Sequence, residues 1–447
     1  MQQKVWSSHF VFLLVAIGTA VGLGNMWKFP YVAGVSGGGA FVLVYILSLV
    51  VFILPVLIAE LMIGRMGRSS SMGSVANVAA QEGHSRAWGI VGLVCALASY
   101  LIMTFYTIVA GWSIGYLIRM VRGDLDGATA ALSTSVFDAL LASPAELALW
   151  HGVFTVATVA IAIRGLEKGV ERAFKLMMPA LFGLLLVLVV YGLTRPSAGE
   201  ALRFLFTPDL SKIDASVVLA AVGQAFFSIG VATGIMITFG AYLPDNISIP
   251  RAALTTVAAD TFVALISGIA IFPIVFQYGL DPAEGPGLVF MTLPVAFAKL
   301  PAGTYVGIAF FVLFIIAALT SLIGTMEAIL VLVEESLGWS RKKAGFIAGG
   351  LAWLLGLTNV LSLNVLSDFR PIAGKTLFEM LDFLTANLML PLGGILVAVF
   401  AGWFVSAKTS EKELRFKSPL LYRAWLVSLR YLAPIAIFLV LLANLRA

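Results

Sequence analysis

Four ionisable side chains stand out inside long apolar stretches of this chain: Lys28, Glu60, Asp260 and Asp382. An ionisable group inside a membrane is costly unless it is paired or binds something, so each of the four is a candidate functional residue. Asp260 lies about two helical turns into its stretch, too deep to reach the surface easily. A carboxylate at that depth suits a hard monovalent cation, which prefers oxygen ligands.

The other polar candidates also have simpler interpretations. Lys28 and Asp382 lie towards the ends of their stretches, where long side chains reach the interface, although as a pair they could form a lid over a central site. Glu60 could be an interfacial carboxylate, or it could accept hydrogen bonds from main-chain N–H groups that a helix break leaves free. Thr320 and Ser321 add hydroxyls at mid-helix, but such hydroxyls most often bond back to the preceding turn.

Glycine-rich interruptions stand in the middle of two apolar stretches. The first, over 18–25, reads GTAVGLGN, and the second, over 228–234, reads SIGVATG. In hydrocarbon every backbone N–H and C=O needs a partner, so irregular backbone survives only where it lines a cavity or binds a ligand. Small residues also serve close helix packing, which explains either stretch taken alone equally well. The two together, at matching positions, favour a binding site for ions or a small polar solute.

Membrane-spanning helices are the elements that carry these residues. The chain has 447 residues, of which 60% are hydrophobic and 11% charged, and this composition excludes an ordinary soluble protein. We predict an all-α integral membrane protein, a single transmembrane domain over residues 1–447 with about eleven transmembrane helices. The predicted spans are about 10–31, 38–62, 88–120, 146–164, 174–194, 217–243, 253–278, 304–333, 344–362, 377–405 and 425–444.

The first and sixth predicted spans carry the interruptions. Two broken spans at this spacing predict two inverted five-helix repeats, helices 1–5 over about 8–194 and helices 6–10 over about 217–405. An additional helix over about 425–444 would follow the second repeat. The binding site would then lie at the interface between the repeats, an arrangement typical of secondary transporters.

Basic residues gather in alternate loops, and their distribution predicts the topology. These loops lie around Arg65, Lys168, Lys342 and Lys412, whereas the intervening loops also carry acids. The positive-inside rule places the basic loops and the N-terminus in the cytoplasm, and the C-terminus outside, in a multi-pass protein of the cell (inner) membrane. The excess of basic residues therefore implies no nucleic-acid partner, and the lone Cys95 allows no internal disulfide.

The interrupted spans closely resemble a known family. The stretch GTAVGLGNMWKFPYVAGVSGGG over 18–39 is similar to the first-helix signature of the neurotransmitter:sodium symporters, in their bacterial amino-acid-transporting branch. GQAFFS over 223–228 resembles their sixth-helix motif, and AALTS over 317–321 resembles their eighth. The similarity covers essentially the whole chain in order. It implies the leucine-transporter-like fold and the sodium-coupled import of an amino acid by alternating access.

The resemblance further implies two sodium ions and no organic cofactor. Sodium site one would use Ala20, Asn25, Ser228 and Asp260, completed by the carboxylate of the substrate. Sodium site two would use Gly18, Val21, Ala317, Thr320 and Ser321. Many relatives carry asparagine in place of Asp260. A fixed negative charge there could replace the chloride that animal members require, so we expect chloride-independent transport.

The substrate would lie between the two breaks, with its carboxylate near the freed amides of 22–24 and the Tyr106 hydroxyl, helped by the positive end of a half-helix. The substrate-binding residues implied are Ala20, Gly22, Leu23, Gly24, Ile102, Tyr106, Phe227, Ser228, Gly230, Thr233, Ser321 and Thr325. Gly22 stands where the monoamine transporters carry an aspartate, which favours an amino acid. Another small zwitterionic or amine solute is the alternative.

The resemblance also implies gates at both ends of the site. The outer gate would pair Lys28 with Asp382. The family usually has arginine in place of Lys28, so the bidentate pairing that arginine allows is lost. The inner gate would be reduced to Lys4 and Trp6, with Glu335 as the candidate partner. Gly169 and Pro179 match the family's glycine–nine–proline spacing at the start of helix five, a turn that could unwind to release sodium, although an ordinary helix start is the alternative.

Two other classes of protein compete with a transporter. Gly34–Gly37 matches the GxSG string of rhomboid-type intramembrane proteases, but that chemistry needs a general base beside Ser36. His9, His84 and His151 lie at a span edge, in a loop and at a span start, so we expect no enzyme. A channel or a non-transporting receptor is the third class, because a sequence does not display alternating access. The particular amino acid and the oligomeric state stay open.

Overall fold

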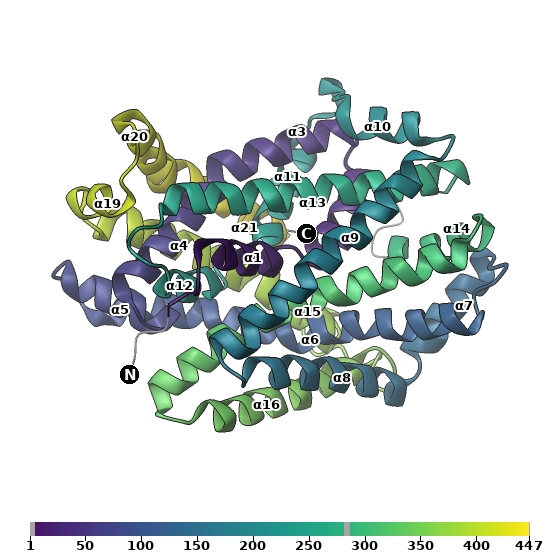
Figure 1. Ribbon diagram of the computed structural model, residues 1–447, viewed down its shortest axis with the longest axis horizontal. Coiled ribbons are helices and arrows are strands. Elements are labelled where there is room, and N and C mark those ends of the chain that lie inside the picture. Colours follow the sequence, from purple (N-terminus) through teal and green to yellow (C-terminus); the bar gives the residue numbers. More distant parts are fainter. Residues whose placement is uncertain (1–4, 281–286, 447) are drawn as a thin grey trace.

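The computed structural model describes residues 5–280 and 287–446, and the regular secondary structure of this part of the chain is helical, with one isolated β-bridge between Ile372 and Lys375. Most long helices run between two ends of the molecule (Figure 1). We call one of them the basic end, because the helices of the basic loops, α5 (Ser71–Gln81) and α19 (Ala407–Leu414), lie there. The helices of the intervening, outer connections, α7 (Ala130–Leu141), α10 (Ala198–Phe206) and α14 (Leu293–Lys299), lie at the opposite end.

Nine continuous helical segments within the described residues are long and apolar enough to cross a membrane. They are Gly39–Gly67 (α3 Gly39–Ser48, η2 Leu49–Ile53, α4 Leu54–Gly67), Arg86–Arg122 (η3 Arg86–Trp88, α6 Gly89–Arg122), Pro144–Ala162 (α8), Leu166–Leu193 (η4 Leu166–Glu171, α9 Arg172–Leu193), Ile249–Gln277 (α13), Gly303–Leu337 (α15), Arg341–Ser362 (α16), Leu377–Phe404 (α17 Leu377–Asp382, η7 Phe383–Met389, α18 Leu390–Val399, η8 Phe400–Phe404) and Pro419–Leu445 (α20 Pro419–Val427, η9 Ser428–Leu432, α21 Ala433–Arg446). Each coincides with one of the predicted spans.

Several observed helices extend beyond their predicted spans at the basic end. The predicted spans 38–62, 174–194 and 425–444 begin or end five or more residues short of Gly67, Leu166 and Pro419. The reason is that Arg65, Lys168 and other basic residues lower the hydropathy of these helix ends without breaking the helix, because their side chains reach the polar interface.

The first span is broken, as predicted. Helix α1 (His9–Ala20) ends where Val21 takes an extended conformation, with φ −69° and ψ 104°. The chain resumes in a π-helical turn, η1 (Gly24–Lys28), and continues as α2 (Phe29–Val35). The two halves are bent by 51° relative to each other. Residues 21–23 therefore have backbone groups that no regular helix satisfies.

The sixth span is broken as well. Helix α11 (Ala215–Ile229) and helix α12 (Ile235–Ala241) are joined by residues 230–234, of which Gly230, Ala232 and Gly234 have positive φ. Glycine adopts this conformation freely, whereas alanine is strained there by of order 1 kcal/mol. Both predicted interruptions thus exist as breaks in the backbone. The division of the chain into two inverted repeats stays a prediction.

Short helices fill the connections at the two ends. They are α7 (Ala130–Leu141), α10 (Ala198–Phe206), η5 (Leu210–Lys212), η6 (Leu288–Thr292) and α14 (Leu293–Lys299) in the outer connections, and α5 and α19 at the basic end. At the basic end the Arg65 guanidinium, almost fully buried, donates to Glu413 of α19 and to the Ile247 carbonyl before α13. This contact fixes α4 against the start of the span that carries Asp260.

Close glycine contacts hold the broken helices against their neighbours. A Cβ on Gly64 of α4 would lie 1.9 Å from the Ile237 carbonyl oxygen of α12, and one on Gly240 would lie 2.5 Å from the Leu61 carbonyl oxygen. A Cβ on Gly324 of α15 would lie 2.3 Å from Cγ2 of Thr19 in α1. Such approaches need glycine, so these residues place α1 and α12 around the centre of the molecule.

We predict that Gly64→Ala destabilises the protein by about 1–3 kcal/mol, because the added methyl group overlaps the backbone of α12. The matched control is Gly183→Ala in α9, where an added Cβ meets no atom within 4 Å and helix propensity improves. Thermal-shift measurements in detergent should give a lower Tm for the first variant and an equal or higher Tm for the second. Equal Tm values for Gly64→Ala and the unmodified protein would contradict the crossing geometry.

Candidate functional site

Side chains from other helices or from the break itself form hydrogen bonds with the backbone groups of the first break. The Gly22 N–H donates to Oδ1 of Asn25 at 3.0 Å, and the Leu23 N–H donates to the Tyr106 hydroxyl of α6 at 3.0 Å. The Gly24 carbonyl accepts a hydrogen bond of 2.8 Å from Nε2 of Gln224 in α11. The break in α1 is therefore tied to both the third and the sixth span.

A carboxylate from the second span accepts a hydrogen bond from the backbone of the second break. Glu60 of α4 is fully buried, and its Oε1 accepts a hydrogen bond of 2.8 Å from the Ala232 N–H. This is the role predicted for Glu60, and it accounts for the strained conformation of Ala232. The second carboxylate oxygen, Oε2, is buried and has no hydrogen-bond partner among the described residues.

Asp260 lies at the centre of a polar cluster between the two breaks. Its Oδ1 accepts a hydrogen bond of 2.8 Å from Nδ2 of Asn25, and its Oδ2 accepts one of 2.8 Å from the Ser228 hydroxyl. Nδ2 of Asn25 also donates to Oγ of Ser228 at 3.1 Å, and Tyr45 donates to Oγ of Ser228 at 3.2 Å. Asp260 is completely buried, and none of the ion pairs among the described residues involves it. The cluster joins Asn25, Ser228 and Asp260, as the sequence led us to expect.

The hydroxyls of α15 form a second polar cluster beside α1. The Ser321 hydroxyl donates to the Thr19 carbonyl at 3.0 Å, so it bridges α15 to the last turn of α1. The Thr320 hydroxyl donates to the Ala317 carbonyl at 2.9 Å within its own helix. On the other side of α1, Gly18 packs closely against Met178 of α9. Residues of the predicted second ion site therefore lie together where α1 ends.

The predicted solute-binding residues surround the same breaks. A Cβ on Gly22 would lie 2.5 Å from Oγ of Ser321 and 2.8 Å from the Tyr106 oxygen, so no larger residue fits at this position without rearrangement. The hydroxyls of Thr233 and Thr325 donate to the carbonyls of Gly230 and Ser321. Gly24 faces the Phe227 ring, and Ile102 of α6 packs against the hydrophobic core beside it.

The arrangement corrects two expectations about the first break. The amides of Gly22 and Leu23, expected to be free for a carboxylate, are already donating to Asn25 and Tyr106. The Asn25 amide, expected to offer its oxygen to an ion, instead turns its NH₂ group towards Asp260. The reason is the same in both cases. A buried donor or acceptor is costly when left unpaired, so the cluster closes on itself with its own side chains.

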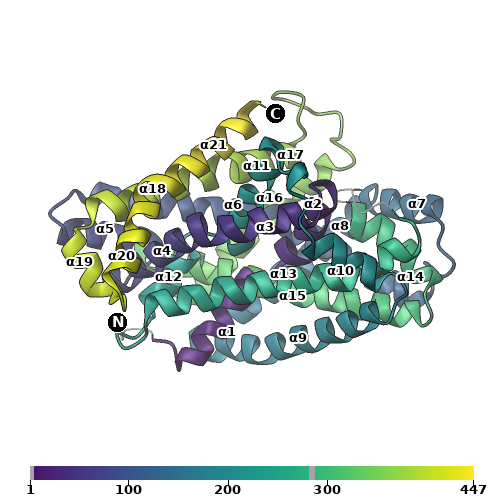
Figure 2. The ribbon, with the colours of Figure 1, turned by 90° about the horizontal axis from the view of Figure 1, so that it is seen from above.

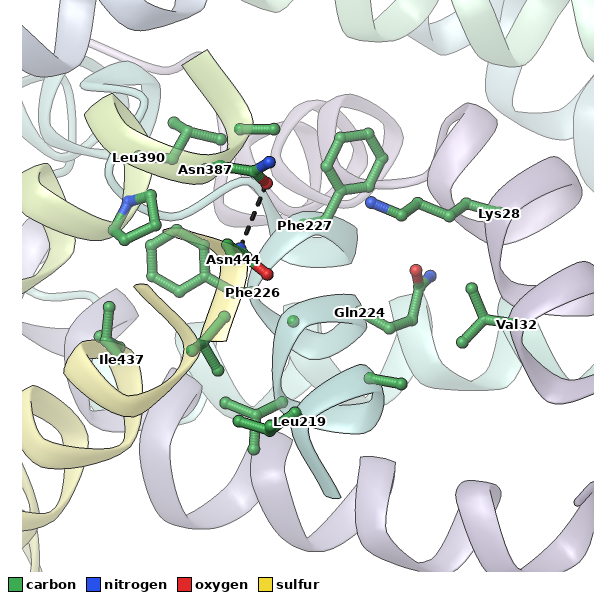
Figure 3. Close-up of a pocket in the computed structure, with 16 residues that line it drawn as sticks. Lys28, Val32, Leu219, Gln224, Phe226, Phe227, Asn387, Leu390, Ile437 and Asn444 are labelled. Carbon is green, nitrogen blue, oxygen red and sulfur yellow. Dashed lines mark hydrogen bonds between the residues drawn. The ribbon is translucent and has the colours of Figure 1, made fainter. Parts of the chain in front are cut away.

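The expected ion pair between Lys28 and Asp382 does not form, which corrects the predicted lid. Nζ of Lys28 lies over the Phe227 ring, 4.0 Å from its centroid, and Asp382 is exposed. Lysine lacks the fork of arginine that would bridge two helices, and the aromatic face gives its ammonium a partner instead. The helices α11 and α21 lie side by side (Figure 2). A cavity of about 240 Å³ lies beside the Lys28 contact, between α11, η7 and α21 (Figure 3). Gln224 and Asn387 line it.

At the basic end, Trp6 anchors the start of the chain. Its indole N–H donates to the Phe239 carbonyl of α12 at 3.1 Å, and its ring packs edge-on against Tyr242. Lys4 lies outside the described residues, so its pairing stays a prediction. Glu335, its candidate partner, accepts hydrogen bonds from the Ser69 hydroxyl and the Ser70 N–H, at 2.5 and 2.6 Å. Glu335 therefore holds the loop before α5.

A buried ionic network, which the sequence analysis missed, closes the basic end. Glu327 of α15 is fully buried, forms an ion pair with Arg341 of α16 and accepts a hydrogen bond of 3.2 Å from Tyr242. Arg341 also donates to the Ala162 carbonyl at the end of α8. The sequence does carry a signal for it, because Glu327 is an acidic residue within a predicted span, as Asp260 is.

The start of the fifth span is helical in this structure. Gly169 lies in the π-helical turn η4, and Pro179 lies inside α9, so the predicted unwinding between them stays a prediction. Ser7 holds this turn to the start of the chain, because its N–H and hydroxyl donate to the Glu171 carboxylate at 3.0 and 2.5 Å. Glu171 is almost fully buried.

The arrangement required for a serine protease is not present among the described residues. Ser36 ends α2, and its N–H donates to the Val32 carbonyl. His151 contacts the Thr107 hydroxyl and the Trp353 carbonyl, and His84 packs against Phe404. His9 is an exposed residue at the start of α1. No histidine is therefore placed to act as a base for Ser36.

Comparisons with known proteins agree with this geometry. The model of the sodium:neurotransmitter symporter family matches residues 3–136 and 143–447. YhdH of Bacillus subtilis (strain 168), described as an uncharacterized sodium-dependent transporter, is 36% identical over 98% of this chain and 96% of its own length. An uncharacterized sodium-dependent transporter of Haemophilus influenzae is 32% identical over 99% of this chain and 98% of its own length.

Among solved structures, the crystal structure of MhsT in complex with L-phenylalanine has a TM-score of 0.90 and 39% sequence identity, and the similarity covers 99% of both chains. The match of the family model extends over nearly the whole chain. The expected fold class is therefore confirmed, and so is the expectation that the family is one of transporters. The chain belongs to the sodium:neurotransmitter symporter family and is a multi-pass, sodium-dependent symporter.

Proposed function

We propose that this protein imports an amino acid into the cell together with two sodium ions, bound between the breaks of the first and sixth spans, without a need for chloride. The observation that carries the proposal is the buried Asp260 carboxylate, which forms no ion pair with any basic residue that the structure describes. An isolated charge in a low-dielectric interior is unfavourable by several kcal/mol, which binding of a cation removes.

Sodium site one fits the cluster around Asp260. Asp260 and Ser228 offer oxygen ligands, and the NH₂ group of Asn25 now stands between them, donating to both. Rotation of this amide would present its oxygen instead and make room for a cation. The negative charge of Asp260 then balances the ion, which is why no chloride is required. This supports Asp260, Ser228 and Asn25 as ligands, with the Ala20 carbonyl and the substrate carboxylate.

Sodium site two fits the end of α1 beside α15. Ser321 already links the two helices through the Thr19 carbonyl, and Thr320 lies one residue before it. Carbonyls of Gly18, Val21 and Ala317 with these two hydroxyls form an all-oxygen set, which hard cations prefer. The break frees the two α1 carbonyls for this purpose, because Val21 leaves the helical conformation.

The space beside Gly22 favours an amino acid as substrate. An aspartate side chain in place of Gly22 would overlap Ser321 and Tyr106. This position therefore provides no carboxylate that could bind the ammonium group of an amine substrate. The Tyr106 hydroxyl, which accepts from Leu23 and contacts the Ser321 side chain, would donate its proton to a substrate carboxylate. Thr233 and Thr325 have their hydroxyls bonded to backbone, which leaves methyl groups for an uncharged side chain. MhsT, 39% identical, was crystallised with L-phenylalanine.

The two ends of the site differ in a way that fits alternating access. At the basic end, the contacts of Trp6 and Glu327 join α12, α15 and α16. At the opposite end, Lys28 and Asp382 form no ion pair with each other, and Asp382 is exposed. With the basic end in the cytoplasm of the cell membrane, the N-terminus inside and the C-terminus outside, this arrangement would admit solute from outside.

We predict that proteoliposomes containing the protein accumulate a neutral, apolar L-amino acid when an inward sodium gradient is imposed. A radiolabelled panel of the common amino acids, with potassium in place of sodium as the control, measures this uptake. Replacement of chloride by gluconate should change the rate by less than about twofold, because Asp260 supplies the fixed charge. Sodium flux without accumulation of solute would indicate a channel, and dependence on chloride would contradict the charge argument.

We predict that Asp260→Asn raises the sodium concentration for half-maximal substrate binding by at least about tenfold, since it removes the charge that balances the ion. A scintillation-proximity assay with sodium titration measures this. The matched control is Asp138→Asn, an exposed residue of α7. Unchanged sodium affinity in Asp260→Asn would remove Asp260 from the site.

We predict that Tyr106→Phe weakens substrate binding by about tenfold or more, because a hydrogen bond to a charged group contributes about 1.5–3 kcal/mol. The control is Tyr100→Phe in the same helix, whose hydroxyl donates to the Ala348 carbonyl of α16 instead. Saturation binding at fixed sodium compares the two variants. If both variants bind as the unmodified protein does, the carboxylate lies elsewhere.

A further inference from the structure

One hydroxyl beside the proposed sodium site two is used by nothing in the structure. Oγ1 of Thr19 is buried and has no hydrogen-bond partner among the described residues, and the residue is only 8% exposed. A threonine within a helix normally bonds back to the carbonyl of the preceding turn. Other buried helical threonines among the described residues do so, for example Thr107 to the Met103 carbonyl and Thr158 to the Phe154 carbonyl. A buried hydroxyl left unpaired costs about 1–3 kcal/mol, so this position needs an explanation.

The Thr19 hydroxyl faces α15 one turn further towards the basic end than sodium site two. The Thr19 carbonyl accepts a hydrogen bond from Ser321, whereas the Thr19 side chain lies against Gly324. A Cβ added to Gly324 would lie 2.5 Å from Oγ1 of Thr19. Residues four apart lie on the same face of a helix, so Gly324 follows Thr320 directly along α15. The absence of a side chain at Gly324 leaves the face of α15 open to this hydroxyl.

The same face of α15 continues to the buried carboxylate at the basic end. Glu327 follows Thr320 by seven residues, which is two turns or about 10 Å along the helix. The Thr19 hydroxyl lies between these two levels. Oxygen atoms therefore stand at successive turns, first the hydroxyls of Thr320 and Ser321, then Thr19, then Glu327. Beyond Glu327 are its partners Arg341 and Tyr242.

We propose that the Thr19 hydroxyl is a transient ligand that passes sodium from site two towards Glu327 when the basic end opens. This inference rests on the proposed sodium site two. In hydrocarbon-like surroundings an ion that leaves five oxygen ligands meets a large barrier unless another oxygen is within reach. Thr19 supplies that oxygen, and the ion pair of Glu327 with Arg341 keeps the route closed until α16 moves. Its role is in release, not in the resting affinity of the site.

The alternative is that Thr19 only packs between α1 and α15. Valine has the same shape as threonine without the hydroxyl, and serine keeps the hydroxyl without the methyl group. Thr19→Val and Thr19→Ser therefore separate the two roles. Thr158→Val is the matched control, since Thr158 is also buried but bonds within its own helix far from the site.

The experiment measures three quantities on purified protein. These are the sodium concentration for half-maximal substrate binding, the rate at which radioactive sodium dissociates after dilution, and the maximal rate of sodium-driven uptake in proteoliposomes. Thr19→Val should slow dissociation and maximal uptake by about tenfold, with the binding midpoint within about twofold. Thr19→Ser and Thr158→Val should stay within about twofold of the unmodified protein in all three.

The possible results are distinguishable. Unaltered dissociation and uptake in Thr19→Val overturn the proposal, as does an equal slowing in Thr19→Ser, which would indicate packing alone. A raised binding midpoint in Thr19→Val, with unchanged dissociation, would also overturn it, since the hydroxyl would then act on the way in. If the unmodified protein neither retains radioactive sodium nor takes up solute with it, the proposed function fails, and this inference fails with it.

Discussion

Every feature of the site follows from the requirement that backbone groups inside a membrane must find hydrogen-bond partners. Two breaks expose such groups at mid-depth, and each is satisfied by side chains, most of them from another span. Tyr106 accepts from Leu23, Gln224 donates to Gly24, and Glu60 accepts from Ala232. These contacts hold the two breaks in fixed positions relative to the third and second spans. In the proposed function, the oxygens that remain for ligands between the breaks include those of Asp260 and Ser228.

The placement of charge separates the two functions of the interior. Near the basic end, some ion pairs have at least one buried member, as in the carboxylate of Glu327 with Arg341 and the guanidinium of Arg65 with Glu413. Between the breaks, Asp260 has only neutral partners, although it is completely buried. A paired charge stabilises one arrangement of helices, whereas an unpaired one makes the arrangement depend on a cation. In the proposed mechanism, ion binding and closure of the protein are therefore carried by different residues.

The fold could be predicted to a large extent because its signal is local. An apolar run of about 20 residues predicts a span wherever it occurs, and the interruptions at 18–25 and 228–234 are visible as glycine and polar residues within such runs. Span ends were less accurate, since basic residues such as Arg65 lower hydropathy while the helix continues. Glu327 was overlooked, and its role depends on Arg341 of the next span, a partner that hydropathy does not reveal.

The sequence by itself determined the spans, the two breaks and the presence of Asn25, Ser228 and Asp260 as polar residues at depth, because each of these is a property of a short segment. Only the tertiary structure decided which groups meet. It placed Lys28 over Phe227 instead of beside Asp382, used the amides of Gly22 and Leu23 internally, and left the Thr19 hydroxyl facing Gly324. Pairings of this kind join distant residues, such as Ser321 and Thr19, which are 302 positions apart, and they depend on crossing angles and close contacts that no local pattern encodes.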